Sequence, residues 1–215
     1  KRFSLIKKTK IINLHFGKIK LDLTQAIDRE IYLSGFYEKD QLKYLNKICS
    51  NKKIDYFFDI GSNIGYYSLY FKNIENIYSF EPNKNNFLRL KENIKLNKLN
   101  IKAHNFGLSN SNSETKIWYT DEKKMGGSAI FQKDDAELKK YDVKNIYLEK
   151  ISVKRLDDII NINDSKILAK IDVERHEKKV LEGMKDTINN NDIILQIEIG
   201  EEKKWKILWI KLIPY

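Results

Sequence analysis

The sequence is poor in cysteine, proline, glycine and histidine, and each shortage excludes a class of protein or site. A single cysteine, Cys49, cannot form an internal disulfide, which is typical of a reducing compartment. Only two prolines and nine glycines are present, which argues against long flexible linkers. The three histidines are dispersed, and none lies in an HExxH pattern or beside a cysteine pair. We therefore predict no structural zinc site and assign no metal ligand, and the sequence leaves open whether a divalent metal assists.

Long apolar runs are also absent. No run approaches the roughly 20 residues that a membrane-spanning helix requires. The opening segment Lys1–Lys8 is basic but lacks the apolar centre of a signal peptide. These absences predict a cytoplasmic location and no membrane span. Because the chain does not begin with methionine, we expect it to start inside a longer protein.

The remaining composition is that of a globular protein. Of 215 residues, 41% are hydrophobic and 33% are charged, which is typical of one folded domain. The net charge is +10, from 40 basic and 30 acidic residues. Lysines are spread along the whole chain instead of clustering, so the charge favours a solvated surface and argues against a nucleic-acid partner.

Short apolar runs alternate with helical patterns from residue 54 onward. This alternation predicts an α/β, Rossmann-like fold, in which a mostly parallel sheet has helices on both faces and binds ligands at the carboxyl ends of its strands. Residues 1–48 contain strand-like stretches around Gly17 and a short helix at 40–49. We predict that 1–48 form an N-terminal arm packed on a core domain of residues 49–215. The expected core strands are 54–59, 76–80, 101–106, 167–171 and 193–199.

Further extended segments are expected at 115–120 and 145–153, joined by a polar stretch that contains Gly126–Ser128. Asn83 is expected to cap the helix that follows the second core strand, and one helix is expected through residues 180–188.

The first candidate site follows the first core strand. Asp59, Gly61, Ser62, Asn63 and Gly65 form a strand end, a glycine turn and the start of a helix. Glycine lets the backbone approach a ligand closely, and the first turn of a helix offers unpaired N–H groups. This pattern predicts a loop that binds a nucleotide-like cofactor.

The next strand decides between cofactors. Glu81 and Pro82 close it, and an acid at that place can accept both ribose hydroxyls of an adenosine group. Asp59 would repel a pyrophosphate but suits the cationic amino group and sulfonium of S-adenosylmethionine. We therefore predict S-adenosylmethionine as the cofactor. Asn105, after the third strand, is a candidate hydrogen-bond partner of adenine, with a simple polar turn as the alternative.

Charged residues gather where the strand at 167–171 ends. Methylating an alcohol requires a base near the acceptor oxygen, and Asp172 and Glu174 are the catalytic candidates. For Glu174, a mere interaction with the dipole of the following helix is an equal alternative. His176 is expected on the surface. Glu198 ends the next strand on the same rim, and we expect it to line the acceptor pocket.

With these residues the chain resembles the FkbM-type methyltransferase family. The family pattern D-x-G-A-N-x-G-x-x-(S/T) is matched from Asp59 to Ser68, with Ser62 where alanine is usual. The resemblance covers roughly residues 20–200. The other matched positions are Gly35, Tyr37, Glu38, Glu81, Pro82, Leu90, Asn93, Asn97, Lys170, Ile171, Asp172, Val173, Glu174, Glu177, Val180, Leu181 and Gly183.

The resemblance implies a class I methyltransferase fold and O-methylation of a hydroxyl on a sugar or other small metabolite. The expected partner is therefore a small-molecule or saccharide acceptor, whose identity the sequence does not specify. The resemblance also implies that Tyr37 and Glu38 approach the cofactor or the acceptor.

Two departures from the family are visible. Arg175 stands where the family usually has glycine, and a positive φ at this position would cost on the order of 1 kcal/mol or more. The residues after Gly200 are too few for the family's last helix and antiparallel hairpin. We expect a truncated C-terminal hairpin whose exposed edge favours a homodimer.

Three alternatives stay open. Arg175 and the short end are consistent with a non-catalytic or impaired cofactor-binding protein of the same fold. The +10 charge is consistent with an RNA methyltransferase, although the Asn/Asp-Pro-Pro-aromatic motif and the Pro-Cys nucleophile of nucleic-acid enzymes are lacking. A nucleotide-dependent oxidoreductase is opposed by Asp59.

Overall fold

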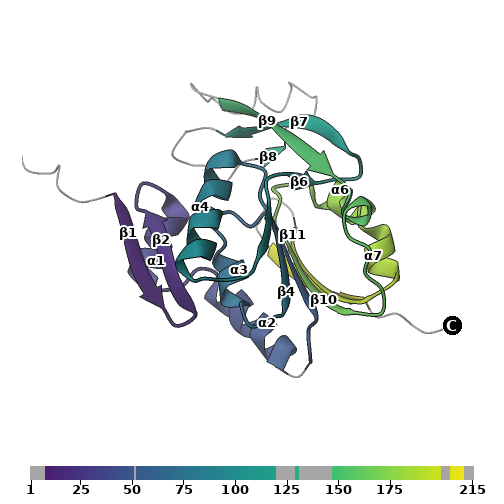
Figure 1. The fold of residues 1–215 in the computed structure, drawn as a ribbon, viewed down its shortest axis with the longest axis horizontal. Helices are drawn as coiled ribbons and strands as arrows, with labels where there is room; N and C mark the ends of the chain where they lie inside the picture. Colours follow the sequence, from purple (N-terminus) through teal and green to yellow (C-terminus); the bar gives the residue numbers. More distant parts are fainter. Residues whose placement is uncertain (1–7, 51, 120–128, 131–146, 200–203, 211–215) are drawn as a thin grey trace, which may run out of the picture.

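A six-stranded, mainly parallel sheet is the centre of the fold (Figure 1). The computed structural model describes residues 8–50, 52–119, 129–130, 147–199 and 204–210. In spatial order the strands of this sheet are β12 (Lys204–Ile210), β11 (Asp192–Ile199), β10 (Lys166–Ile171), β3 (Tyr56–Ile60), β4 (Asn76–Phe80) and β5 (Lys102–His104).

The strand order reverses in the middle of the sheet. From β3 the chain runs outward through β4 to β5, and it then returns to the other side of β3 to form β10 and β11. These five strands are parallel, and β12 is antiparallel to β11. In open α/β sheets, ligands bind at the carboxyl ends of the strands where the order reverses. The predicted Rossmann-like α/β fold is confirmed, and β3 and β10 flank its reversal point.

Alternating side chains give the sheet two apolar faces. Phe57 and Leu168 belong to one hydrophobic core, and Phe58 and Ala169 belong to the other. Figure 1 shows helices on both sides of the sheet, with α3 and α4 opposite α6 and α7. The helical segments are α1 (Ala26–Ser34), α2 (Lys39–Ser50), α3 (Tyr66–Tyr70), α4 (Lys84–Leu96), the 3-10 segment η2 (Leu156–Asp158), α6 (Glu177–Glu182) and α7 (Lys185–Asn189).

The N-terminal segment is a β-hairpin followed by two helices. Strands β1 (Thr9–Leu14) and β2 (Gly17–Asp22) pair antiparallel around the turn at residues 15–16, and the predicted helix at 40–49 is α2. Helix α1 was not predicted. Apolar side chains of the hairpin, including Ile19 and Leu21, share one core with the central sheet. The domain boundary at residue 48 stays a prediction.

Asn93 of α4 and Asn97, which directly follows this helix, attach the hairpin to the core. Asn93 accepts a hydrogen bond from the backbone N–H of Lys20 at 2.7 Å and donates one to the carbonyl of Ile64 at 3.0 Å. Asn97 accepts from the N–H of Lys18 at 2.7 Å and donates to its carbonyl at 2.6 Å. Asn93 therefore links β2 to the loop that precedes α3.

A second sheet lies between β5 and β10 in the sequence. Figure 1 shows it at the top of the molecule, above α4 and α6. The extended segments predicted at 115–120 and 145–153 correspond to its two longer strands where they are described, and the predicted polar stretch at Gly126–Ser128 lies outside the described residues. In spatial order the strands are β6 (Gly107–Leu108), β9 (Tyr147–Lys154), β7 (Ser113–Tyr119) and β8 (Ala129–Ile130).

The C-terminal part contributes one antiparallel strand to the edge of the central sheet. Strand β12 pairs with β11 along its whole described length. The expected exposed edge is therefore occupied by β12 within the described residues, and the homodimer stays a prediction. None of the helices in the described part of the chain combines the length and apolar character that crossing a bilayer demands.

Candidate cofactor and acceptor site

One face of the central sheet changes from apolar to polar toward the carboxyl ends of its strands. Ser79, Asp59, Lys170 and Gln196 lie side by side on β4, β3, β10 and β11. Each is at most 4% exposed. Side chains two residues apart in a strand share a face, so this polar row directly follows an apolar row. Buried polar groups require hydrogen-bond or charged partners. Helix α3 and the loops that follow β3 and β10 supply most of these partners.

The predicted cofactor loop has a left-handed backbone at three positions. Gly61, Asn63 and Gly65 have φ of 79°, 49° and 85°. A Cβ on Gly61 would lie 1.8 Å from the carbonyl oxygen of Asp172, so no larger residue fits there. The backbone N–H groups of Gly61 and Ser62 both donate to the carbonyl of Phe80, at 3.0 and 3.1 Å. These contacts fasten the loop between β4 and the end of β10.

Asp59 holds the start of α3. One carboxylate oxygen accepts hydrogen bonds from the backbone N–H and the hydroxyl of Ser68, and that hydroxyl lies 2.7 Å from the hydroxyl of Ser79. The other oxygen, Oδ1, is buried and has no hydrogen-bond partner among the described residues. Burial raises the pKa of Asp59, while Lys170 and Ser68 oppose the shift.

Glu81 joins the two loops that follow β3 and β4. Its carboxylate accepts hydrogen bonds from the backbone N–H groups of Asn63 at 2.8 Å and Asn83 at 2.9 Å. Burial raises the pKa of Glu81 to about 7, although both N–H groups lower it. Asn105 donates to the carbonyls of Glu81 and Pro82, at 2.9 and 3.0 Å. Asn105 thus shapes the loop, and its predicted contact with adenine stays a prediction.

Lys170 joins the cofactor loop to the predicted catalytic aspartate. Its ammonium lies 3.0 Å from Oδ2 of Asp172, 3.4 Å from the carbonyl oxygen of Gly61 and 4.9 Å from the centre of the Tyr67 ring. Burial lowers the pKa of Lys170, but the carboxylates of Asp172, Asp59 and Glu38 outweigh it, and the net shift is upward. Lys170 was not predicted as a site residue. The available signal was a lysine in the interior of the strand KILAKI, where the other residues after Lys166 are apolar.

Tyr37 and Glu38, from the N-terminal segment, lie beside Lys170 and Tyr67. The hydroxyl of Tyr67 donates to Glu38 at 2.6 Å, and Tyr37 also hydrogen-bonds to Glu38. The amide of Gln196 donates to the Tyr67 hydroxyl at 3.3 Å. Burial raises the pKa of Glu38, opposed by Lys170. The structure therefore places Tyr37 and Glu38 beside the polar row, and it adds Tyr67 and Gln196, which the sequence did not single out.

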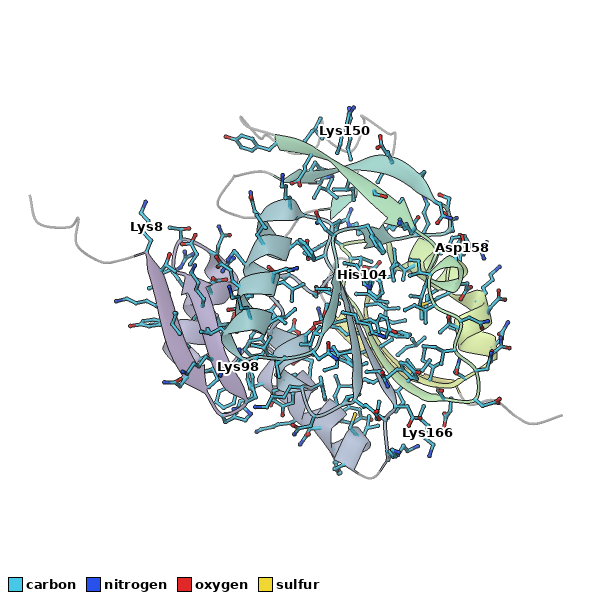
Figure 2. The ribbon with its side chains drawn as sticks, in the orientation of Figure 1. Lys8, Lys98, His104, Lys150, Asp158 and Lys166 are labelled. Carbon is cyan, nitrogen blue, oxygen red and sulfur yellow. The ribbon has the colours of Figure 1, made fainter. Side chains whose placement is uncertain are left out.

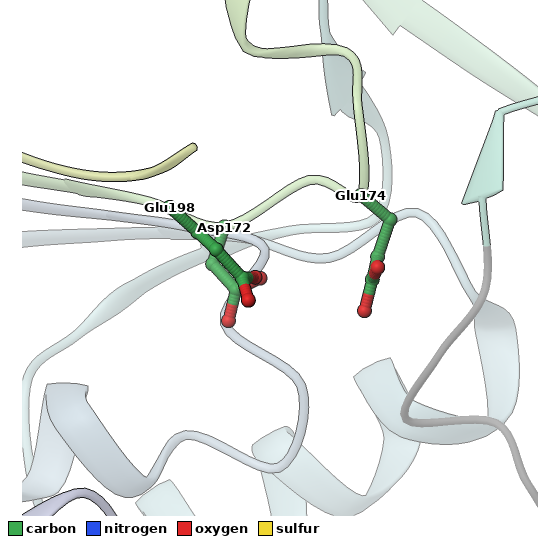
Figure 3. A group of neighbouring side chains, drawn as sticks. All are labelled: Asp172, Glu174 and Glu198. Carbon is green, nitrogen blue, oxygen red and sulfur yellow. The ribbon is translucent and has the colours of Figure 1, made fainter. Parts of the chain in front are cut away.

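Three carboxylates face one another on the rim. Asp172 follows β10 and Glu198 lies near the end of β11, and Figure 3 shows them side by side with Glu174 opposite. Their ligand atoms lie within 4.8 Å of one another, and all three residues are half-buried. Carboxylates at this spacing can accept hydrogen bonds from acceptor hydroxyls, and a divalent cation can also use them as ligands. The three predicted acceptor-side acids are thus brought together.

The residue that replaces the family glycine has a left-handed backbone. Arg175 has φ of 74°, and its neighbour Glu174 has φ of 49°. The positive φ that was considered for this position is therefore present. The N–H of Arg175 donates to Oε1 of Glu177 at 3.0 Å, which holds the turn against the start of α6.

The predicted surface position of His176 is wrong. His176 is 4% exposed, and its Nε2 lies 3.0 Å from the hydroxyl of Ser109 in the segment between β6 and β7. Burial lowers its pKa to about 4, and Lys179 contributes. Gly183 packs closely against the same segment, because a Cβ on Gly183 would lie 1.9 Å from the Ser109 carbonyl oxygen. The chain bends between α6 and α7, where one continuous helix was predicted.

Strand β5, the third of the predicted core strands, ends in an aromatic stack away from the three rim carboxylates. His104 lies near the middle of the molecule in Figure 2. Its ring stacks on Phe80 at 5.2 Å and on Tyr78 at 6.2 Å between centroids. Phe106 packs against Phe80 and His104, and the ammonium of Lys154 lies 4.7 Å from the Phe106 centroid.

Several known proteins are similar to this chain. The hexuronic acid methyltransferase AglP of Haloferax volcanii is 27% identical over 151 residues, which cover 70% of this chain and 59% of AglP. The methyltransferase FkbM from Methylobacillus flagellatus is 17% identical, with a TM-score of 0.42 over 67% of this chain and 33% of that one. A tRNA methyltransferase of M. jannaschii is 13% identical, with a TM-score of 0.47 over 91% of this chain and 45% of that one.

The chain spans less than two thirds of the length of each of these proteins. The sequence profile of the Methyltransferase FkbM domain matches residues 59–208, from the cofactor loop through most of β12. The match includes Asp59, Glu81, Asp172, Glu174 and Glu198. This chain belongs to the FkbM methyltransferase domain family.

Proposed function

We propose that this protein transfers a methyl group from S-adenosylmethionine to an oxygen of a saccharide or similar small acceptor. The observation that carries the proposal is the pairing of the glycine loop after β3 with buried Glu81 after β4, beside the reversal point of the sheet. A buried carboxylate beside a glycine loop at this place in the sheet suits an adenosine-containing cofactor. Family membership supports the same chemistry.

The residues at the loop fit this cofactor. Oδ1 of Asp59 and the hydroxyl of Ser62 are buried without hydrogen-bond partners among the described residues, so each has capacity for a ligand group. Asp59 suits the cationic end of the cofactor, and Glu81 suits its ribose hydroxyls. Gly61, Asn63 and Gly65 hold the backbone of the loop where a ligand can approach it. S-adenosylmethionine supplies a methyl group that is activated by its sulfonium.

The protein's remaining task is to position the acceptor and receive its proton. Asp172 and Glu174 are the proposed bases, and Glu198 with Tyr37 and Glu38 is proposed to bind the acceptor. The rim carboxylates of Figure 3 can accept hydrogen bonds from several hydroxyls of one polyol. Holding the two reactants in line supplies most of the acceleration in such transfers. The name of AglP supports a sugar acceptor.

Calorimetric titration with S-adenosylhomocysteine tests the cofactor site. We expect saturable binding that Glu81→Ala abolishes and that Glu92→Ala leaves intact. Glu92 is a matched control, because it lies on the exposed surface of α4, away from the cofactor loop, and pairs with Lys20. Failure of the folded wild-type protein to bind would refute the proposal.

Transfer itself is tested with radiolabelled S-adenosylmethionine and two acceptor probes, p-nitrophenyl glucoside and p-nitrophenyl glucuronide. The first offers hydroxyls only, and the second adds a carboxylate. Labelled product that Asp172→Asn suppresses would support the assigned base. Product formation at an undiminished rate in both Asp172→Asn and Glu174→Gln would remove both residues from this role.

Arg175 supports a second candidate, a cofactor-binding protein with impaired catalysis. The left-handed turn places strain directly beside the proposed base Glu174. Binding without transfer in the wild-type protein, with transfer appearing in Arg175→Gly, would favour this candidate over an active enzyme.

A further inference from the structure

Lys170 is buried within the central sheet, where lysine is almost never found unless it is paired. Its side chain is buried on the polar row, between Asp59 on β3 and Gln196 on β11. A buried ammonium is stable only when charged or polar groups surround it closely. Here the partners come from separate parts of the site, namely Asp172 on the acceptor side and the Gly61 carbonyl in the cofactor loop.

The backbone already brings these two parts into contact. The N–H of Asp172 donates to the carbonyl of Ile60 at 3.0 Å, and the Cα of Gly61 packs against the Asp172 carbonyl. Backbone contact alone leaves the Asp172 side chain free to rotate. The ammonium of Lys170 removes this freedom, because Oδ2 of Asp172 lies 3.0 Å away.

Lys170 is itself held from the other side. Its ammonium lies over the Tyr67 ring, at a distance typical of a cation–π contact. Tyr67 cannot move away, because its hydroxyl is bonded to Glu38 and Gln196. The ammonium is therefore fixed against three elements, the cofactor loop, the end of β10 and α3.

We propose that Lys170 is a positioning residue that couples the cofactor loop to Asp172, so that cofactor binding and the orientation of the acceptor base depend on each other. This inference rests on the proposed function. Lys170 does not touch the reacting atoms. It acts through the Gly61 carbonyl on one side and through the Asp172 carboxylate on the other.

A double-mutant cycle on cofactor affinity tests the coupling. S-adenosylhomocysteine is the probe, because its neutral sulfur minimises direct charge effects of the substitutions. We expect Lys170→Met to weaken its binding about tenfold, the value of one hydrogen bond to a charged group. Asp172→Asn should weaken binding about threefold in the wild-type background and have no further effect in the Lys170→Met background.

Lys102→Met is the matched control. Lys102 also lies over a tyrosine ring, 4.5 Å from the centre of Tyr78, and hydrogen-bonds to its hydroxyl, but it lies on exposed β5 outside the site. Its substitution should leave affinity unchanged. Thermal unfolding followed by circular dichroism checks that every variant is folded. If Lys170→Met does not fold, Lys170→Arg takes its place, because it keeps the charge but replaces a point charge by a planar fork.

The outcomes are separable. If the wild-type protein does not bind S-adenosylhomocysteine, the proposed function is contradicted. Binding by the wild-type protein with equal effects of Asp172→Asn in both backgrounds overturns the coupling alone. An unchanged affinity in folded Lys170→Met overturns it as well. Loss of the Asp172→Asn effect in the Lys170 variant supports the coupling, which a merely structural lysine would not produce.

Discussion

Arg175→Gly is expected to stabilise the protein. Arg175 has φ of 74°, where an L-residue costs roughly 1–2 kcal/mol relative to its preferred regions. Glycine removes this cost but gains freedom in the unfolded chain, which offsets about 0.4–1 kcal/mol. The hydrogen bond from Arg175 to Glu177 uses the backbone N–H and survives the substitution. The net expectation is a gain of about 1 kcal/mol.

The assay is thermal unfolding at pH 7.5. For a chain of this size, 1 kcal/mol corresponds to a rise in Tm of about 2–4 °C. Arg175→Ala is the control, because it removes the long side chain but keeps a Cβ at the same φ. Gly35→Ala is the reverse test, since Gly35 has φ of 76° and an added Cβ would meet nothing within 4 Å. It should lose about as much stability as Arg175→Gly gains. Equal stabilisation by Arg175→Ala and Arg175→Gly would refute the backbone argument.

Three further predictions concern pH and close packing. His176 has a pKa of about 4 in the folded protein and about 6.5 when unfolded, so its contribution to stability is complete above pH 6.5 and is lost as the pH falls toward 4. Urea unfolding should show that His176→Gln reduces the loss of unfolding free energy between pH 7.5 and pH 5 by about 1–2 kcal/mol. The same loss in the variant and the wild-type protein would contradict a buried neutral ring. Glu81 has a pKa of about 7, and ribose hydroxyls favour its ionised form. Affinity for S-adenosylhomocysteine should therefore rise about tenfold per pH unit below pH 7 and level off above it. A calorimetric affinity that stays constant from pH 5.5 to 8 would exclude Glu81 as the ribose ligand. Gly183→Ala should lower the free energy of unfolding by about 1–3 kcal/mol in the same urea assay, because the added Cβ would collide with the Ser109 carbonyl. An unchanged free energy of unfolding would mean that the segment around Ser109 can shift to accommodate the Cβ.

Much of the fold follows from local sequence. Apolar runs separated by helical patterns predicted the strands, since a parallel strand buried on both faces must be apolar nearly throughout. Asn83 was expected to cap the helix that follows it, and its side chain accepts a hydrogen bond from the N–H of Asn86 at 2.9 Å. The cofactor loop was predictable because its glycines lie between a strand and a helix. These features depend on residues that are neighbours in the chain.

Other features depend on which distant segments meet. The surface prediction for His176 was wrong because Ser109, far away in the sequence, covers it. Tyr67 and Gln196 have the sequence appearance of ordinary helix and strand residues. Only the hydrogen bonds of Tyr67 with Glu38 and of Gln196 with Tyr67 place them at the site.

The sequence by itself therefore determined the alternation of strands and helices in the core from residue 54, the glycine loop and the acids at the strand ends, because alternation and turn chemistry act locally. Only the tertiary structure decided which of those acids are neighbours and what neutralises them. Pairing of β10 with β3 and β11 places Lys170 beside Asp59 and Gln196, and the ends of the same strands place Asp172 beside Glu198. Burial and electrostatic partnership depend on the register between strands, and the register depends on the packing of the whole sheet.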